Sequence, residues 1–293
     1  MKALLGVALA AFLAVACSES SATRQPIPKF EHVIVVVLEN QNQGSVLGSD
    51  DAPHFNAYAK RYAVLSHYGG VAHPSLPNYL ALVSGSTHGI SSDCTSCTVG
   101  GRSLADTLEA RKLTWKAYAE GLPRAGWTGP SRGRYAKKHV PFLYFRRVLD
   151  RPARLKRVVP LTQLARDRAA DHLPNFALVV PDLCHDMHDC SVATGDAWLK
   201  RFLPPLLKLP GTAVFVVFDE SDTADPGVPA LALGPLVRAR SYSTSKTSHY
   251  GLLRTIEEGF GLPLLGQSAR ATPVTGIWSL PPRELKEGSA PRP

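Results

Sequence analysis

The fold is decided by the sequence VIVVVLEN at residues 33–40. Its first six residues are apolar and five of them are β-branched, with no alternation between apolar and polar positions. A half-exposed strand alternates, so this pattern predicts a strand that is buried on both faces of a sheet. The strand ends in Glu39 and Asn40. Ligands of open α/β sheets bind beyond the carboxyl ends of the strands, so this acid and amide are candidate functional residues. The alternative is that they are simply the polar end of a strand and have no role in function.

Apolar runs and amphipathic segments alternate along the rest of the chain. We predict further strands at residues 113–119, 176–180, 212–218 and 228–233. We predict helices at residues 54–62, 76–83, 103–112, 162–173, 195–209 and 248–258. This order is typical of an α/β fold, here a three-layer α/β/α sandwich with a mostly parallel central sheet. The strand at 212–218 ends in Asp219 and Glu220, a second polar pair at the same kind of position.

A second decisive stretch is HPSLPNYLALVSG at residues 73–85. Proline is tolerated in a first helical turn, so Leu76 and Pro77 predict a helix start with Ser75 at or just before its N-cap. A hydroxyl there faces unpaired backbone N–H groups and the positive end of the helix dipole. That position favours an anion or a deprotonated nucleophile. The alternative is that Ser75 is an ordinary capping residue.

The polar groups of these stretches form a set of hard oxygen donors, namely Glu39, Asn40, Ser75, Asp219 and Glu220. Such donors suit Mg²⁺, Ca²⁺ or Mn²⁺, with Zn²⁺ or Fe as further candidates. A bound cation would lower the pKa of the serine hydroxyl and neutralise charge during phosphoryl transfer. A nearby histidine would protonate a leaving alkoxide, although each single histidine is more commonly structural.

The N-terminal residues 1–16 are predicted to be a signal peptide, with Lys2 as the positive region before an apolar run. Ala16 and Cys17 resemble a bacterial lipoprotein cleavage site, which makes Cys17 the predicted lipidation site. Ordinary secretion with loss of Cys17 is the alternative. Residues 17–28 are then a linker, 29–280 a single domain and 281–293 a flexible tail. No other stretch has the length of a membrane helix.

Four further cysteines, Cys94, Cys97, Cys184 and Cys190, enter an oxidising compartment after export, where disulfides are the default. Sequence proximity favours the pairs Cys94–Cys97 and Cys184–Cys190. A crossed pairing, a redox-active Cys94–Cys97 pair and a four-cysteine zinc site are the alternatives.

The charge of the chain is concentrated in one segment. The 293 residues carry a net charge of +9, and residues 124–157 contain eleven Lys and Arg side chains but one acid, Asp150. This segment is predicted to be a basic insertion. It is either a solvated surface or a surface that gathers anionic substrates or an anionic membrane. Nucleic acid is not an expected partner, because no binding motif accompanies the charge.

Several motifs together carry a resemblance. They are residues 32–40, 73–82, 135–142, 184–190, 218–220 and 249–257. In this order they resemble the bacterial phosphoesterase family that contains acid phosphatases and phospholipases C and is related in fold to alkaline phosphatase. The most similar branch is that of secreted acid phosphatases, including phosphatidylinositol-3-phosphate phosphatases.

The resemblance implies roles for individual residues. A divalent metal ion would be bound by Glu39, Asn40, Asp219 and Glu220, and Ser75 would touch the metal and attack phosphorus to form a phosphoserine. His188 and Asp189 would act beside it in catalysis. The expected substrate-binding residues are Asn78, His139, Asp186 and His249.

The implied function is metal-dependent hydrolysis of phosphate monoesters, with a small phosphorylated molecule or a phospholipid headgroup as substrate. The first alternative is a phospholipase C-like phosphodiesterase. Two departures weigh against it, because residues 219–222 lack the glycine-containing stretch of many phospholipases and position 75 is Ser where these often have Thr. The second alternative is a catalytically inactive, anion-binding surface lipoprotein.

Overall fold

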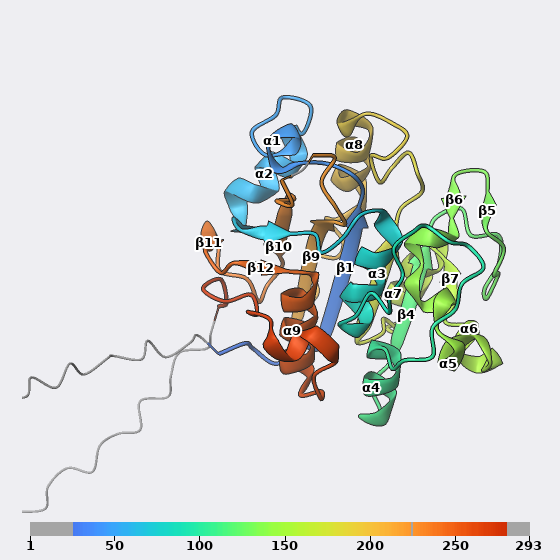
Figure 1. The fold of residues 1–293 in the computed structure, drawn as a ribbon. Helices are drawn as coiled ribbons and strands as arrows, with labels where there is room; N and C mark the ends of the chain where they lie inside the picture. Colours follow the sequence, from blue (N-terminus) through green and yellow to red (C-terminus); the bar gives the residue numbers. More distant parts are fainter. Residues whose placement is uncertain (1–25, 224, 280–293) are drawn as a thin grey trace, which may run out of the picture.

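A computed structural model gives the structure of residues 26–223 and 225–279 (Figure 1). The predicted signal peptide, Cys17, residues 17–25 of the linker and the tail at 281–293 lie outside the described residues. Within the two described ranges, every helix is too short or too polar to cross a bilayer.

The described chain is built on an eight-stranded sheet. In spatial order its strands are β11 (Ser241–Ser243), β2 (Ala63–Leu65), β10 (Ala230–Leu233), β9 (Thr212–Phe218), β1 (His32–Leu38), β8 (Phe176–Val180), β4 (Trp115–Ala119) and β7 (Val158–Pro160). Neighbouring strands are parallel except where β10 pairs with β9 and β2. The prediction of a mostly parallel sheet is therefore confirmed. Two small ribbons lie apart from it, β3 (Tyr68–Gly69) with β12 (Thr247–Ser248) and β5 (Ser131–Arg132) with β6 (Tyr135–Ala136).

Helices cover both sides of the sheet (Figure 1). They are α1 (Gln43–Val46), α2 (Pro53–Arg61), α3 (Ser75–Ser84), α4 (Leu104–Ala110), α5 (Arg146–Leu149), α6 (Pro152–Leu155), α7 (Thr162–Ala169), α8 (Val192–Phe202) and α9 (His249–Phe260), with 3₁₀ turns η1 (Lys137–His139), η2 (Pro141–Tyr144) and η3 (Gly266–Arg270). Helix α3 packs against α9, and α2 packs against α8.

The central strands β1 and β9 carry the apolar core between these layers. Every residue of β9 is buried, and β1 is buried from Val33 to Leu38. Their register pairs Leu38 with Phe218. The residues that follow, Glu39 and Asp219, are thereby brought side by side at the carboxyl edge of the sheet.

The structure differs from the sequence prediction at a few elements. Helix α8 begins earlier than predicted, after Ser191, and ends at Phe202, just before the Pro204-Pro205 pair that removes backbone donors. Strands β2 and β7 were not predicted, because three residues are too few to show a periodic pattern.

The basic segment at 124–157 is part surface and part core. Residues 140–145 in its middle are all buried, and Arg154 pairs with Asp106 and Glu109 of α4. Some of the positive charge is therefore neutralised inside the fold, and the segment also supplies η1 to the candidate site.

A buried acid away from that site gives a test of the fold. Glu257 of α9 accepts hydrogen bonds from the Leu265 N–H at 2.9 Å and the Ser268 hydroxyl at 2.5 Å. Burial raises its pKa from 4.5 to about 8. The folded state therefore binds the proton more tightly than the unfolded state does. The stability that this proton contributes is complete below the unfolded pKa and is lost as pH rises toward the folded pKa.

We expect the free energy of unfolding of the wild type to fall relative to Glu257→Gln between about pH 4.5 and 8, by on the order of 2–4 kcal/mol. Urea unfolding of both proteins across this range measures the difference. Parallel stability profiles would show that Glu257 is not protonated in the fold.

Candidate active site

The site is built where β1 and β9 end. Glu39 follows β1 and Asp219 follows β9, and the Asp219 N–H donates to the Leu38 carbonyl at 3.0 Å. The Asn40 backbone N–H donates to Asp219 Oδ1 at 3.1 Å. Asn40 has a φ of 51°, a left-handed conformation that Asn tolerates better than most residues. The chain therefore turns sharply at this point and ties the two strand ends together.

Ser75 projects between two of these carboxylates. Its Oγ lies 3.0 Å from Glu39 Oε2 and 3.2 Å from Glu220 Oε1, and the hydroxyl is buried. Helix α3 begins at Ser75 with Pro74 as its N-cap. Ser75 is therefore the first helical residue and not the cap, which corrects the prediction by one position. Either carboxylate is placed to accept the serine proton.

Three more side chains, those of Tyr79, His139 and Asp186, reach the same cluster from elsewhere in the chain. His139 of η1 has its Nε2 at 3.2 Å from Glu39 Oε1 and its Nδ1 at 3.4 Å from Asp186 Oδ2. The Glu39 N–H also donates to the Asp186 carbonyl at 2.8 Å. Tyr79 donates to Glu39 Oε1 at 2.5 Å and stacks on His139. The sequence resemblance predicted that His139 and Asp186 bind the substrate. In the structure both residues lie next to Glu39, which was predicted to bind the metal.

Charge repulsion and burial dominate the electrostatics of the cluster. Burial raises the pKa of Asp219 to about 8, assisted by the charge of Glu220. Burial also raises the pKa of Asp186 to about 7 and that of Glu39 well above its ordinary value. The pKa of His139 is lowered well below its ordinary value by the same desolvation. A divalent cation would favour the ionised carboxylates and the neutral imidazole, which are the forms that bind metals.

The cluster also has buried polar atoms without a hydrogen-bond partner. They are His139 Nε2, Asp186 Oδ2, Asp219 Oδ2 and Glu220 Oε2. All of these except Asp219 Oδ2 have an ion-pair contact but make no hydrogen bond, His139 Nε2 with Glu39, Asp186 Oδ2 with His139 and Glu220 Oε2 with His73. Buried polar atoms normally have a partner, so these atoms require an explanation. The ligand atoms of Glu39, His139 and Asp186 lie within 4.8 Å of one another. Three convergent donors with unsatisfied atoms fit a divalent metal ion.

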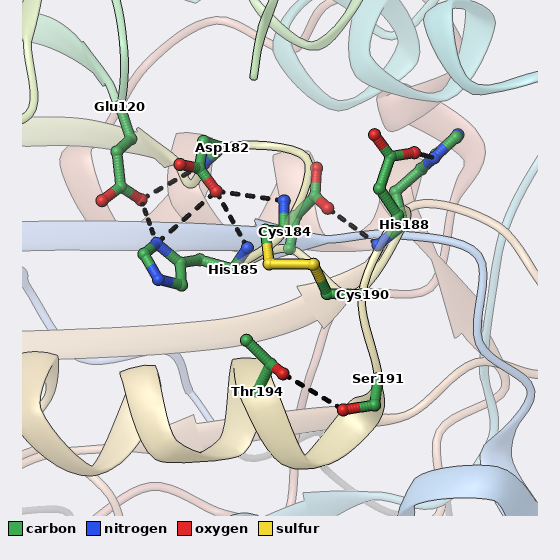
Figure 2. Close-up of a disulfide and its surroundings, with 10 residues drawn as sticks. Glu120, Asp182, Cys184, His185, His188, Cys190, Ser191 and Thr194 are labelled. Carbon is green, nitrogen blue, oxygen red and sulfur yellow. Dashed lines mark hydrogen bonds and ion pairs between the residues drawn. A yellow bond between two sulfur atoms is a disulfide. The ribbon is translucent and has the colours of Figure 1, made fainter. Parts of the chain in front are cut away.

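Both disulfides that sequence proximity favours are present, Cys94–Cys97 and Cys184–Cys190. They use all the cysteines of the described residues, so the crossed pairing and the zinc site are wrong. Figure 2 shows the Cys184–Cys190 loop, in which His185 is turned toward Glu120 and Asp182.

Glu120, Asp182 and His185 form a second group of clustered donors. Glu120 follows β4, and its Oε2 lies 3.0 Å from His185 Nδ1 and accepts from the Asp182 N–H. Asp182 Oδ1 accepts from two backbone N–H groups of the loop. The group is internally hydrogen-bonded, and it fixes the loop that carries Asp186 into the site.

His188 lies at the open side of the cluster. Its ring centroid is 6.2 Å from that of His139, and its Nδ1 lies 2.7 Å from Asp189 Oδ1. The carboxylate orients the ring. The roles of His188 and Asp189 in catalysis stay predictions, and the geometry is compatible with them.

Asn78 and His249 are already engaged in this structure. The Asn78 amide donates to the Ala72 carbonyl and accepts from the Val71 and Ala72 N–H groups, so it shapes the loop before Ser75. His249 is buried, with Nε2 donating to the Asp219 carbonyl at 2.5 Å and Nδ1 at 2.8 Å from the Tyr68 hydroxyl. Burial lowers the pKa of His249 to about 4, so its ring is neutral. Both residues position the site here, and their contact with substrate stays a prediction.

Comparison with known proteins assigns the chain to a family. The sequence pattern of the Phosphoesterase family matches residues 45–263. This chain belongs to the Phosphoesterase family. A phosphatidylinositol-3-phosphatase of Mycobacterium tuberculosis is 36% identical over 286 residues, which cover 94% of this chain and 93% of that protein. A phosphate-repressible acid phosphatase of Penicillium chrysogenum is 30% identical over 224 residues, covering 71% of this chain and 54% of that enzyme.

The family match and the names of these relatives confirm the predicted enzyme class, a hydrolase of phosphoric monoesters. The chain spans about half the length of the Penicillium enzyme. A protein in the alkaline phosphatase superfamily from Vibrio parahaemolyticus superposes with a TM-score of 0.57 at 12% identity, over 83% of this chain and 70% of that chain. This likeness concerns the fold, and it confirms the alkaline-phosphatase-like architecture.

A glycine next to the site provides a test of its geometry. A Cβ at Gly70 would lie 2.9 Å from the Asp219 carbonyl oxygen and 3.3 Å from Glu220 Cα. We expect Gly70→Ala to displace the Asp219–Glu220 backbone and to lower kcat at least about tenfold, because small displacements of catalytic groups are costly. Steady-state kinetics with circular dichroism as a folding check measure this. Gly100→Ala is the control, since a Cβ there meets nothing within 4 Å. Unchanged kcat in Gly70→Ala would show that this backbone does not set the catalytic geometry.

Proposed function

We propose that this protein hydrolyses phosphate monoesters through a phosphoserine formed on Ser75, in a metal-dependent reaction. The observation that carries the proposal is the Ser75 hydroxyl on the first turn of α3, held between Glu39 and Glu220. A buried hydroxyl between two carboxylates has acceptors for its proton, and the helix N-terminus favours the negative charge that develops on its oxygen.

The metal ligands that we propose are Glu39, Asn40, Ser75, Asp219 and Glu220. His139 Nε2 and Asp186 Oδ2 make no hydrogen bond and converge with Glu39, which makes these two residues further candidates. Carboxylate oxygens with one imidazole suit Mn²⁺, Zn²⁺ or Fe better than Mg²⁺ or Ca²⁺, which prefer oxygen donors alone. When bound, the cation would lower the pKa of the serine and stabilise charge on the phosphoryl group.

We propose His188 as the group that protonates the leaving alkoxide. Asp189 Oδ1 is hydrogen-bonded to Nδ1 of His188, so Nε2 of His188 is available for the proton transfer. Its position beside His139 places it at the edge of the cluster, where a leaving group would depart.

The substrate that we propose is a phosphomonoester of a polar alcohol, such as a phosphorylated polyol headgroup. A cavity of about 1010 Å³ is lined by Gly70, next to the site, and by side chains that include Gln43, Lys246 and Arg270. The two basic side chains suit an anionic, phosphate-bearing headgroup. The name of the Mycobacterium relative, a phosphatidylinositol-3-phosphatase, agrees with this substrate class. The two disulfides fit an exported protein. Lipid anchoring at Cys17 and contact with an anionic membrane stay predictions.

The test is hydrolysis of p-nitrophenyl phosphate and of its bis-ester, after removal of metal by a chelator and resupply of single divalent ions. We expect monoester hydrolysis that needs metal and falls about 10³-fold or more in Ser75→Ala, because the nucleophile is removed. Ser131→Ala in the exposed strand β5 is the control. Mass spectrometry of acid-quenched enzyme should detect a phosphate on Ser75.

Faster hydrolysis of the bis-ester would instead identify a phosphodiesterase. Full activity of Ser75→Ala would contradict the proposed nucleophile, and activity that survives complete metal removal would contradict the metal dependence. Absence of turnover with every metal would favour the anion-binding alternative.

A further inference from the structure

A second cavity, of about 640 Å³, lies apart from the candidate active site. Its walls come from α7, from the end of α8 and from the segment that follows β4. Among the described residues that line it there is no proposed metal ligand, and neither Ser75 nor His188 belongs to the lining. Its volume falls within the range of about 300–1,000 Å³ that is typical of small-molecule pockets. The cavity is therefore large enough for a ligand of its own.

Most of the lining of this cavity is apolar. Leu122, Leu164 and Leu206 come from three separate segments, and each is at most 4% exposed. The lining also contains three prolines, namely Pro123, Pro160 and Pro205. Proline has a fixed φ and no N–H donor, so these positions give rigid walls with few polar partners. Such walls suit the apolar part of a ligand.

Two arginines make one end of the cavity cationic. Arg168 lies in the last turn of α7 and Arg201 in the last turn of α8. The two helices follow the parallel strands β7 and β8 and run back across the sheet, so both last turns lie toward its amino-terminal edge. Within residues 26–223 and 225–279, neither guanidinium has a carboxylate partner, whereas Arg154 has two. Both charges are therefore available to an anionic ligand.

The acid in the described lining, Glu120, does not neutralise these arginines. It follows the end of β4, at the opposite, carboxyl-terminal edge of the sheet. Its Oε2 lies 3.0 Å from His185 Nδ1 and accepts a hydrogen bond from the Asp182 N–H at 3.2 Å. The carboxylate thus has partners outside the cavity, and the cavity keeps an apolar middle and a cationic end.

We propose that this cavity is a second ligand site, which binds a single-chain anionic amphiphile of the fatty-acid type. The alkyl chain lies against the leucines and the carboxylate binds Arg168 and Arg201. Guanidinium groups bind carboxylates through paired, charge-assisted hydrogen bonds, and burial of an alkyl chain is favourable in proportion to its area. A neutral lipid would leave the arginines unused, and a small anion would leave the apolar walls in water. An anionic amphiphile matches both parts of the lining.

The test is calorimetric titration of the full chain with dodecanoate, below the concentration at which it forms micelles. Dodecyl maltoside has the same alkyl chain with a neutral head, and butyrate has the same head with a short chain. We expect dodecanoate to bind with a stoichiometry of one. Its Kd should be at least about tenfold lower than those of the two comparison ligands, because only dodecanoate uses both the apolar walls and the arginines.

Two pairs of variants locate the site. Ala165 is an exposed residue of α7 that lines the cavity, so Ala165→Phe fills the space without disturbing the core and should raise the Kd for dodecanoate about tenfold or more. Ala169→Phe, at an exposed position of the same helix outside the lining, is its control.

The double variant Arg168→Gln/Arg201→Gln should raise the Kd for dodecanoate about tenfold or more and leave that for dodecyl maltoside unchanged. The double variant Arg166→Gln/Lys200→Gln removes the same charge from exposed neighbours outside the lining. It should leave the Kd for dodecanoate within about twofold of the wild type, because surface charges outside the site are screened by solvent. Circular dichroism checks the fold of each variant.

Several results would overturn the proposal. Equal losses of affinity in the two charge variants would show that dodecanoate is attracted only by the net charge of the chain. Unchanged affinity in Ala165→Phe, or no binding of dodecanoate to the wild type, would exclude this cavity as the site. Ser75→Ala should bind dodecanoate like the wild type, and weaker binding there would place the ligand in the candidate active site. A wild-type dimer that Ala165→Phe dissociates in sedimentation would assign the cavity to self-association instead.

Discussion

The constraint on which the rest of the structure depends is the burial of several carboxylates at one edge of a parallel sheet. Glu39, Asp186 and Asp219 are each at most 1% exposed, and burial opposes their ionisation. The fold holds them with hydrogen bonds from Tyr79, from the Asn40 backbone and from Ser75. Rigid, fully buried strands are needed for this, because a flexible support would let the carboxylates separate and reach water. A divalent cation among them would turn this electrostatic cost into binding free energy.

Acidic side chains from two disulfide-bonded segments lie next to Glu39 and next to the start of α3. The Cys184–Cys190 loop presents Asp186 to Glu39, and the contacts of Glu120 with Asp182 and His185 hold that loop against the ends of β4 and β8 (Figure 2). Asp93, directly before the loop closed by Cys94–Cys97, accepts a hydrogen bond from the Leu76 N–H at the start of α3. Ser75 thus lies between the carboxylates at the strand ends and the Asp93 carboxylate at the helix start.

Much of this could be predicted from the sequence because the informative signals are local. The run at 33–38 is apolar at every position, so it predicts a doubly buried strand, and β9 has the same character. Polar residues directly after such strands mark the catalytic edge. His139, by contrast, was predicted to bind the substrate. Its neighbours in the sequence do not indicate that its side chain contacts Glu39, one hundred positions earlier. Lys138 was counted only as part of a basic insertion, and Asp93 received no role.

The sequence by itself determined the fold class, the strand ends that carry acids and the serine at a helix start, and it favoured the disulfide pairs that the structure contains. Each of these follows from residues that are close together in the chain, because hydrophobic periodicity, proline positions and residue spacing are local signals. Only the tertiary structure decided the antiparallel direction of β10, the joining of His139 and Asp186 to Glu39, and the pairing of Asp93 with Leu76 and Lys138. The physical reason is that these contacts join segments distant in the chain. Their partners are selected by sheet register, burial and charge in the assembled fold, and no local pattern records that selection.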